Sequence, residues 1–229
     1  MKTKPYKTYN GGKNGSGVYQ AIINQIPPHD IFISAFAGNC GVLANKKKAL
    51  LTNIAIDIDK KVVDDWNNLK IHVQAIQGDA RTVIQNMTFG TASPFLFFDP
   101  PYLMETRSCK QKLYKNEMSH PAAHIKLLLQ LREIKEMVMI SHYPCKLYND
   151  YLYDWRHVDI QGRTRNGMRT ERLYMNYEAP TELHDYSFIG KNYRDRERLK
   201  KAAANAVKKF SMMRPMERNF ILSEINRTI

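Results

Sequence analysis

Phe95-Leu96-Phe97-Phe98 runs directly into Asp99-Pro100-Pro101-Tyr102. Four consecutive apolar residues predict a buried strand, and the two prolines that follow predict that it ends in a rigid, exposed loop. Ligands of open α/β sheets bind beyond the carboxyl ends of the strands, so Asp99 and Tyr102 are candidate ligand-binding residues. A carboxylate and the proline carbonyls can accept hydrogen bonds from an amino group, and a tyrosine ring offers a stacking face for a planar base.

The residues before this strand predict the cofactor side of an α/β sheet. The β-rich stretch 31–36 leads into Ala37-Gly38-Asn39-Cys40-Gly41, and residues 42–48 can form a helix. In such an arrangement of strand, glycine turn and helix, backbone N–H groups wrap around a nucleoside-bearing cofactor.

Two further strands are predicted to deliver acidic residues to the same edge. The strand 52–56 ends at Asp57, about twenty residues after the glycine turn, where a carboxylate can accept from both ribose hydroxyls. Asp59 is the alternative ribose ligand, or else the N-cap of a helix over 59–69. The strand 71–76 leads to Asp79, which either caps the helix that begins at Ala80 or contacts the cofactor, or does both.

A glycine-rich loop lies near the amino terminus. Tyr9-Asn10-Gly11-Gly12-Lys13-Asn14-Gly15-Ser16-Gly17 precedes an apolar helix over 18–26. Glycines allow close backbone approach to a ligand, but the Gly-Lys-Ser/Thr ending of a P-loop is missing. By itself such a stretch is more often a flexible loop.

In this order, the motifs resemble S-adenosylmethionine-dependent DNA N6-adenine methyltransferases of the Asp-Pro-Pro-Tyr type, in particular phage-like members. The resemblance covers most of residues 9 to 177. It implies that Asp99, Pro100, Pro101 and Tyr102 are catalytic, that Lys13 lies near the methionine carboxylate of the cofactor, and that Asp79 contacts its adenine. The full set of cofactor-binding residues that it implies is Tyr9, Gly11, Gly12, Lys13, Phe36, Ala37, Gly38, Asn39, Cys40, Gly41, Asp57, Ile58, Asp79 and Ala80.

This sequence departs from the family's Phe-x-Gly-x-Gly pattern at two places. Ser34 and Ala35 stand where an acidic residue and a proline are usual, and Cys40 replaces the second glycine. A cysteine is tolerated there if its φ is negative.

Basic segments follow the catalytic loop and are predicted to contact nucleic acid. Residues 103–118 form one segment, and a loop over 162–169 joins two expected antiparallel strands, 155–161 and 172–177, at one sheet edge. Aromatic and basic side chains beside an active site suit an extruded base and its phosphates. The candidate nucleic-acid contacts are Arg107, Lys110, Lys112, Arg163, Arg165 and Arg169.

The overall composition also favours a polyanionic partner. Against 22 acidic residues stand 35 lysines and arginines, a net charge of +13. Three cysteines without a close pair predict neither disulfides nor a zinc site, and no metal site is expected. The apolar runs are too short to span a bilayer, so we expect a cytoplasmic protein without membrane contact. Cys145, although it follows Pro144 as in C5-cytosine enzymes, is expected to be a bystander.

From residue 181 the composition becomes strongly basic. We predict a catalytic domain over 1–180 and a basic helical extension over 181–229, with an amphipathic helix around 199–210 and a second helix from Pro215. The extension either packs on the core with a solvated basic face or clamps a duplex.

We therefore predict an α/β fold: a Rossmann-like seven-stranded, largely parallel sheet with helices on both faces and the basic extension. The expected activity is methylation of adenine N6, in a flipped base of double-stranded DNA, by S-adenosylmethionine. The space between Phe36 and Asp99 is filled by sheet elements, so we expect short or relaxed sequence recognition. The alternatives are RNA N6-adenine methylation, a catalytically silent nucleic-acid-binding subunit and, more narrowly, N4-cytosine methylation; the sequence does not decide oligomeric state or biological role.

Overall fold

The computed structural model describes residues 12–15, 17–69, 72–107, 116–118, 120–164 and 167–228. It divides into two compact units, Met1–Ser187 and Phe188–Ile229. The sequence placed the change near residue 180, where the composition shifts.

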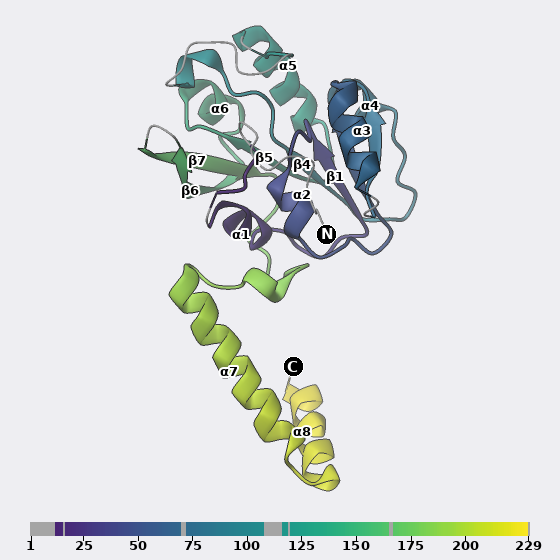
Figure 1. The fold of residues 1–229 in the computed structure, drawn as a ribbon, viewed down its shortest axis with the longest axis vertical. Helices are drawn as coiled ribbons and strands as arrows, with labels where there is room; N and C mark the ends of the chain where they lie inside the picture. The colour runs from purple at the N-terminus through teal and green to yellow at the C-terminus, as the bar shows by residue number, and fades with distance from the viewer. Residues whose placement is uncertain are drawn as a thin grey trace. The chain divides into compact units, whose positions relative to one another are not determined.

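The first unit alternates strands and helices along the chain (Figure 1). Its strands are β1 (Ile31–Ala35), β2 (Thr52–Asp57), β3 (Gln74–Gln77), β4 (Pro94–Phe98), β5 (Met137–His142), β6 (Arg156–Thr164) and β7 (Gly167–Met175). Its helices are α1 (Val18–Ile23), α2 (Gly41–Asn45), α3 (Lys60–Asn68), α4 (Ala80–Gln85), α5 (Pro121–Arg132) and α6 (Lys146–Tyr151), with short 3₁₀ turns at Met104–Thr106 and Tyr186–Phe188.

All seven strands form one sheet in the order β3-β2-β1-β4-β5-β7-β6. The first five strands pair in parallel, and β7 is antiparallel to both β5 and β6. This order, with the last strand inserted between β5 and β6, is the Rossmann-like methyltransferase sheet. The predicted fold class is confirmed.

β4 lies at the centre of the sheet and carries the predicted buried run. Phe95, Leu96, Phe97 and Phe98 are at most 1% exposed. Because side chains alternate along a strand, Leu96 and Phe98 share one face and pack in a core with apolar residues of α4, α5 and α6. On the opposite face Phe95 stacks on Phe32, and the ammonium of Lys46, at the end of α2, lies over the Phe32 ring. Burial on both faces explains why this strand reads as a continuous apolar run.

The register of the central strands aligns the candidate site residues. Ala35 pairs with Ile56 on one side and with Phe98 on the other. The next residue of each chain segment is Phe36, Asp57 and Asp99, so these three lie in one row at the carboxyl edge of the sheet. β1 lies between the two strands that carry Asp57 and Asp99, and each pair of neighbouring strands is about 4.8 Å apart.

The β6–β7 hairpin differs from its prediction. Residues 162–169 were expected to form a loop, but Gly162 pairs with Arg169 and Thr164 with Gly167 within the ladder. Only residues 165 and 166 separate the two strands. The glycines and polar residues that suggested a loop occupy strands that extend beyond the buried sheet, where side chains on both faces can be polar.

The second unit consists of α7 (Tyr193–Ser211) and α8 (Pro215–Thr228). Asn192 caps α7 by accepting a hydrogen bond from the Asp195 N–H at 3.0 Å. No described residue of either helix is buried, and apolar side chains such as Val207 and Phe220 are exposed. Over the described part of the chain, no helix is long and apolar enough to cross a membrane.

Candidate active site

Asp99 follows β4 and forms an ion pair with a lysine from the amino-terminal segment. Lys13 Nζ lies 2.7 Å from Asp99 Oδ1 and 3.6 Å from Glu171 Oε2 of β7. Burial lowers the pKa of Lys13, but the two carboxylates outweigh it and hold the pKa well above its usual range. Burial, together with the nearby Glu171 carboxylate, raises the pKa of Asp99 to about 6 against the opposing effect of Lys13. The site is thus an ammonium shared between two nearly buried carboxylates.

Tyr102 is inside the fold, whereas the sequence predicted an exposed loop. Its side chain is only 9% exposed, and Pro100 is buried as well. The hydroxyl lies 2.9 Å from Ser141 Oγ of β5, and Lys13 Nζ lies 4.8 Å from the ring centroid. The rings of His142 and Tyr143 contact the same ring at centroid distances of 4.8 and 4.6 Å. The prediction of an exposed loop is wrong because tertiary contacts cover it.

The residue after Tyr102 is fixed by a buried histidine. Leu103 N–H donates to His142 Nε2 at 2.9 Å, and His142 Nδ1 lies 2.8 Å from the Tyr143 carbonyl oxygen. A carbonyl can only accept, so Nδ1 carries the proton and Nε2 is the acceptor. Burial lowers the pKa of His142 to about 3, which keeps the ring neutral. The ring also stacks on Tyr148 of α6 at 3.8 Å.

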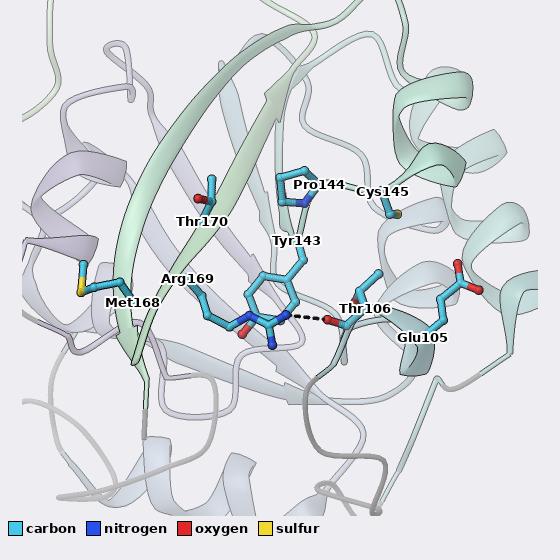
Figure 2. Close-up of a pocket in the computed structure, with 8 residues that line it drawn as sticks. All are labelled: Glu105, Thr106, Tyr143, Pro144, Cys145, Met168, Arg169 and Thr170. Atoms are coloured by element: carbon cyan, nitrogen blue, oxygen red, sulfur yellow. Dashed lines mark hydrogen bonds between the residues drawn. The ribbon is translucent and has the colours of Figure 1, made fainter. Parts of the chain in front are cut away.

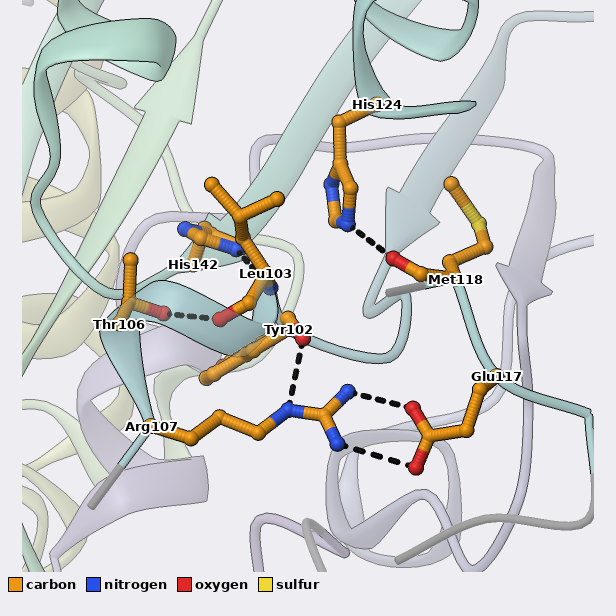
Figure 3. Close-up of polar contacts among 8 residues, drawn as sticks. All are labelled: Tyr102, Leu103, Thr106, Arg107, Glu117, Met118, His124 and His142. Atoms are coloured by element: carbon orange, nitrogen blue, oxygen red, sulfur yellow. Dashed lines mark hydrogen bonds and ion pairs between the residues drawn. The ribbon is translucent and has the colours of Figure 1, made fainter. Parts of the chain in front are cut away.

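Arg107 holds the loop over residues 99–107, the predicted catalytic loop, by a hydrogen bond to Tyr102 (Figure 3). Its Nε donates to the Tyr102 carbonyl at 2.7 Å, while Nη1 and Nη2 donate to the two oxygens of Glu117 at 3.0 and 2.7 Å. The side chains of Arg107 and Glu117 are 5% and 10% exposed. Such a bidentate pair has a fixed geometry. The structure therefore places Arg107 where it holds the backbone of the catalytic loop.

The glycine turn after β1 has an unusual backbone. Phe36 adopts φ 57° and Gly38 φ 44°. A positive φ is strained for a bulky residue and is found mostly where surrounding structure imposes it, often at functional sites. Gly38 N–H donates to Asp57 Oδ2 at 2.9 Å, and its carbonyl accepts from Trp66 Nε1 at 2.8 Å. The turn is thus fixed by hydrogen bonds to Trp66 of α3 and to Asp57 at the end of β2.

The amino-terminal loop packs against this turn by glycine-to-glycine contact. Gly41 N–H donates to the Gly12 carbonyl at 2.8 Å. A Cβ on Gly41 would lie 2.9 Å from the Gly12 and Lys13 oxygens, so only glycine fits there. Cys40 has φ −54°, as its prediction required, and its sulfur caps α2 by accepting from Leu43 N–H at 3.4 Å. The cysteine that replaces the glycine therefore introduces no backbone strain.

Both acids with an alternative role as helix caps do cap helices. Asp59 accepts from Lys61 N–H at the start of α3, and Asp79 accepts from Arg81 N–H at the start of α4, each at 3.0 Å. Asp79 also forms an ion pair with the Arg81 guanidinium, which lowers its pKa. Its contact with a cofactor stays a prediction.

Asp57 is held at the end of β2 by two backbone donors. One oxygen accepts from Gly38 N–H and the other from Asp59 N–H, both at 2.9 Å. Burial raises its pKa, while these two donors oppose the shift. Each oxygen keeps a lone pair, so the carboxylate can still accept from a diol. The glycine turn, with Ile58 half exposed beside Asp57 and Ala80 buried at the start of α4, therefore fits the nucleoside end of S-adenosylmethionine.

A depression of about 600 Å³ opens beside the catalytic loop (Figure 2). Glu105, Thr106, Tyr143, Pro144, Cys145, Met168, Arg169 and Thr170 line it. Arg169 lies over the Tyr143 ring at 4.6 Å, and its Nη2 donates to the Thr106 carbonyl at 3.1 Å. Burial raises the pKa of the Cys145 thiol, which therefore does not favour a thiolate nucleophile. The pocket thus presents a cation and an aromatic ring next to Tyr102.

The structure reaches the predicted nucleic-acid contacts unevenly. Arg169 lines the pocket, whereas Arg107 lies inside the fold with Glu117 and has a structural role there. The side chain of Arg163 and the residues Tyr9, Gly11, Lys110, Lys112 and Arg165 lie outside the described part of the chain. Among the described residues, no three His, Cys, Asp or Glu side chains are grouped to hold a metal ion.

Sequence reasoning missed the residues that reach this site from other elements. Ser141 and His142 of β5, Glu171 of β7 and Glu117 all contact the catalytic loop or Lys13. Only the position of Ser141 and His142, at the carboxyl end of a buried strand, was a usable signal. Glu117 and Glu171 lie in otherwise polar segments and carried none.

The sequence matches no protein-family model and no curated protein. Solved structures are similar at the level of fold. A precorrin 8W decarboxylase from Methanobacterium thermoautotrophicum is 13% identical, covers 74% of this chain and 97% of its own, and has a TM-score of 0.43. An rRNA methylase from Streptococcus thermophilus is 12% identical, with 69% and 93% covered and a TM-score of 0.42.

A third similar structure is a candidate methyltransferase from Streptococcus mutans, solved in complex with SAH. It is 15% identical, with 69% of this chain and 94% of its own covered, and its TM-score is 0.39. Likenesses of this degree concern the fold alone. The chain has a methyltransferase-like fold.

Proposed function

We propose that the chain is an S-adenosylmethionine-dependent methyltransferase that methylates N6 of adenine in DNA, with short or relaxed sequence recognition. The observation that carries the proposal is the row of Phe36, Asp57 and Asp99 at the carboxyl edge of the sheet. Asp57 and the glycine turn are suited to a nucleoside, and Asp99 is suited to an amine. The choice of adenine in DNA rests on the Asp-Pro-Pro-Tyr loop.

The residues of the chain divide the work of this reaction. When bound, S-adenosylmethionine supplies a methyl group on a sulfonium, which passes to the amine nitrogen and leaves S-adenosylhomocysteine. The Asp99 carboxylate accepts a hydrogen of the amino group, which keeps the nitrogen lone pair available, and takes up the proton that the product amine releases. Tyr102 offers its ring to the flipped base. The buried surroundings exclude water from the reacting amine.

The pocket beside Tyr102 supports a nucleic-acid substrate. A base next to the target would meet the Tyr143 ring, and its phosphate would meet Arg169. Tyr143 touches Tyr102, so a base held there lies directly beside the target base. The backbone of Cys40 supports an active enzyme over a silent binding subunit, because its negative φ means that the cysteine adds no strain to the turn where a glycine is usual.

The test is a methylation assay with labelled S-adenosylmethionine and unmethylated duplex DNA. After digestion, label should appear in N6-methyldeoxyadenosine and should vanish in Asp99→Ala. Glu178→Gln, a change at an exposed residue, is the matched control. Label in structured RNA alone, in a competition experiment, would replace DNA by RNA as the substrate. Binding of DNA without any methyl transfer would leave only the silent subunit.

A further inference from the structure

Lys13 occupies the two features that the proposed substrate needs. Its ammonium donates to Asp99 Oδ1 at 2.7 Å, where a substrate amino group would donate. It also lies 4.8 Å above the Tyr102 ring, where a base would stack. An adenine can enter the site only if this ammonium moves away from Asp99.

A buried ammonium cannot leave one carboxylate without another partner. The Lys13 side chain is 2% exposed, and an uncompensated buried charge is strongly destabilising. Among the described residues, the second carboxylate within 4 Å of Nζ belongs to Glu171, at 3.6 Å. A shift of roughly 0.8 Å would bring that pair to the usual charge-assisted distance of about 2.8 Å.

Glu171 is built to stay in place during such a shift. It belongs to β7, where it pairs with Ile160 of β6, and the next residue, Arg172, pairs with His142 of β5. Its Oε2 lies 3.4 Å from Ser141 Oγ, and that hydroxyl is 2.9 Å from the Tyr102 hydroxyl. Glu171 is therefore linked to the same tyrosine that would hold the base.

We propose that Glu171 is a positioning residue that receives the Lys13 ammonium when the amino group of the substrate takes its place on Asp99. The inference rests on the proposed function. Lys13 closes the site while no base is present. When Lys13 leaves Asp99, the Glu171 carboxylate provides the partner that its buried ammonium needs. With Lys13 held by Glu171, the Asp99 carboxylate can accept a hydrogen bond from the substrate amino group. The same residue thus links substrate entry to the state of Asp99.

The first test needs no activity. The coupling between Lys13 and Glu171 is measured from the unfolding of the full chain, in a double-mutant cycle of Lys13→Met and Glu171→Gln. The cycle is repeated in the Asp99→Asn background. This change removes the charge that competes with Glu171 for Lys13, just as a substrate amino group bound to Asp99 would reduce that competition. We expect the coupling to at least double there, because Lys13 then turns to Glu171. A coupling that is unchanged or smaller would overturn the inference.

Glu178→Gln, in place of Glu171→Gln, provides the control cycle and should show no coupling in either background. If Lys13→Met does not fold, Lys13→Gln takes its place in the cycle, since a neutral amide also removes the ammonium charge that pairs with Glu171. The same criterion then applies. A lysine that merely fills space would show no dependence on Asp99.

The second test is kinetic and separates the inference from the proposed function. Glu171→Gln should raise the KM for nucleic acid at least tenfold while cofactor binding stays unchanged. In the Lys13→Met background, the same change should have no further effect. Additive losses in an active enzyme would overturn the inference. An inactive wild type whose unfolding coupling still doubles would refute the proposed function but support the exchange of Lys13 between the Asp99 and Glu171 carboxylates.

The pH profile gives a readout that a purely structural role would not move. Titratable groups face Asp99 from several elements: Lys13, Glu171, Tyr102, Cys40, Tyr143 and Tyr148. Burial raises the pKa of the three tyrosines and of the cysteine, so these four groups are neutral near neutral pH. Glu171→Gln removes a charge that raises the pKa of Asp99. The acid limb of kcat/KM should move to lower pH, and an unmoved limb would contradict the coupling.

Discussion

The Arg107–Glu117 pair gives a sharp prediction about what holds the catalytic loop. In Glu117→Gln, one carboxylate oxygen becomes an NH₂ group facing the guanidinium, so a charge-assisted hydrogen bond worth about 1.5–3 kcal/mol is lost. The Arg107 guanidinium also loses the carboxylate charge of Glu117, and removal of one partner of a buried pair costs about 3–5 kcal/mol. Arg107 keeps its bond to the Tyr102 carbonyl and one bond to the glutamine oxygen. We therefore take the low end, about 3 kcal/mol.

For a domain of this size, about 3 kcal/mol lowers the Tm by roughly 6–12 °C. The control is Asp154→Asn, which breaks an ion pair with Arg132 whose side chains are 46% and 29% exposed. Exposed pairs are worth about 0–1 kcal/mol, so its Tm should fall by no more than about 4 °C. Thermal unfolding of the three full-length proteins, followed by circular dichroism, separates the two ranges.

The same variant should also slow methylation, because the Tyr102 carbonyl depends on Arg107 for its position. Cofactor affinity should be unchanged, since the glycine turn and Asp57 lie on another segment. If Glu117→Gln melts within the range of the Asp154→Asn control, the pair does not hold the loop, and our account of Arg107 fails.

Three further predictions concern the site itself. The value of kcat/KM for nucleic acid should fall as the pH drops through about 6, because protonated Asp99 cannot accept as a carboxylate does; a profile flat from pH 5 to 8 would exclude Asp99 as the acceptor. Asp57→Ala should weaken S-adenosylmethionine binding at least tenfold by calorimetry, whereas Asp59→Asn, which keeps its helix cap, should not. His142→Phe keeps a ring on Tyr148 but leaves the Leu103 N–H without its acceptor, so urea unfolding should show a loss of about 1–3 kcal/mol; equal stability would mean that the hydrogen bond is dispensable.

The sequence by itself determined the elements whose signals are local. A continuous apolar run that ends in Asp99-Pro100-Pro101 predicts a buried strand and its end, because sterics and burial act over a few residues. The acids after the second and third strands were placed correctly at the same edge. The capping role of Asp59 was foreseen for the same reason, since a cap is a contact between residues two or three apart.

Tertiary structure alone decided how these pieces meet. Lys13 and Asp99 are 86 residues apart, and Ser141 and Glu171 are 30 apart. No local pattern encodes such contacts, because they depend on strand order and register. The sequence therefore predicted an exposed Tyr102, but Lys13, Ser141 and His142 enclose it in the fold.

The arginines that the sequence predicted as phosphate contacts show the same limit of local patterns. A basic residue near an active site predicts a phosphate contact from charge alone, and Arg169 does line the open pocket. Arg107, similar in sequence context, turns inward because Glu117 and the Tyr102 carbonyl accept three hydrogen bonds from its buried guanidinium. Composition fixes how many charges a chain carries, whereas packing decides which of them face water.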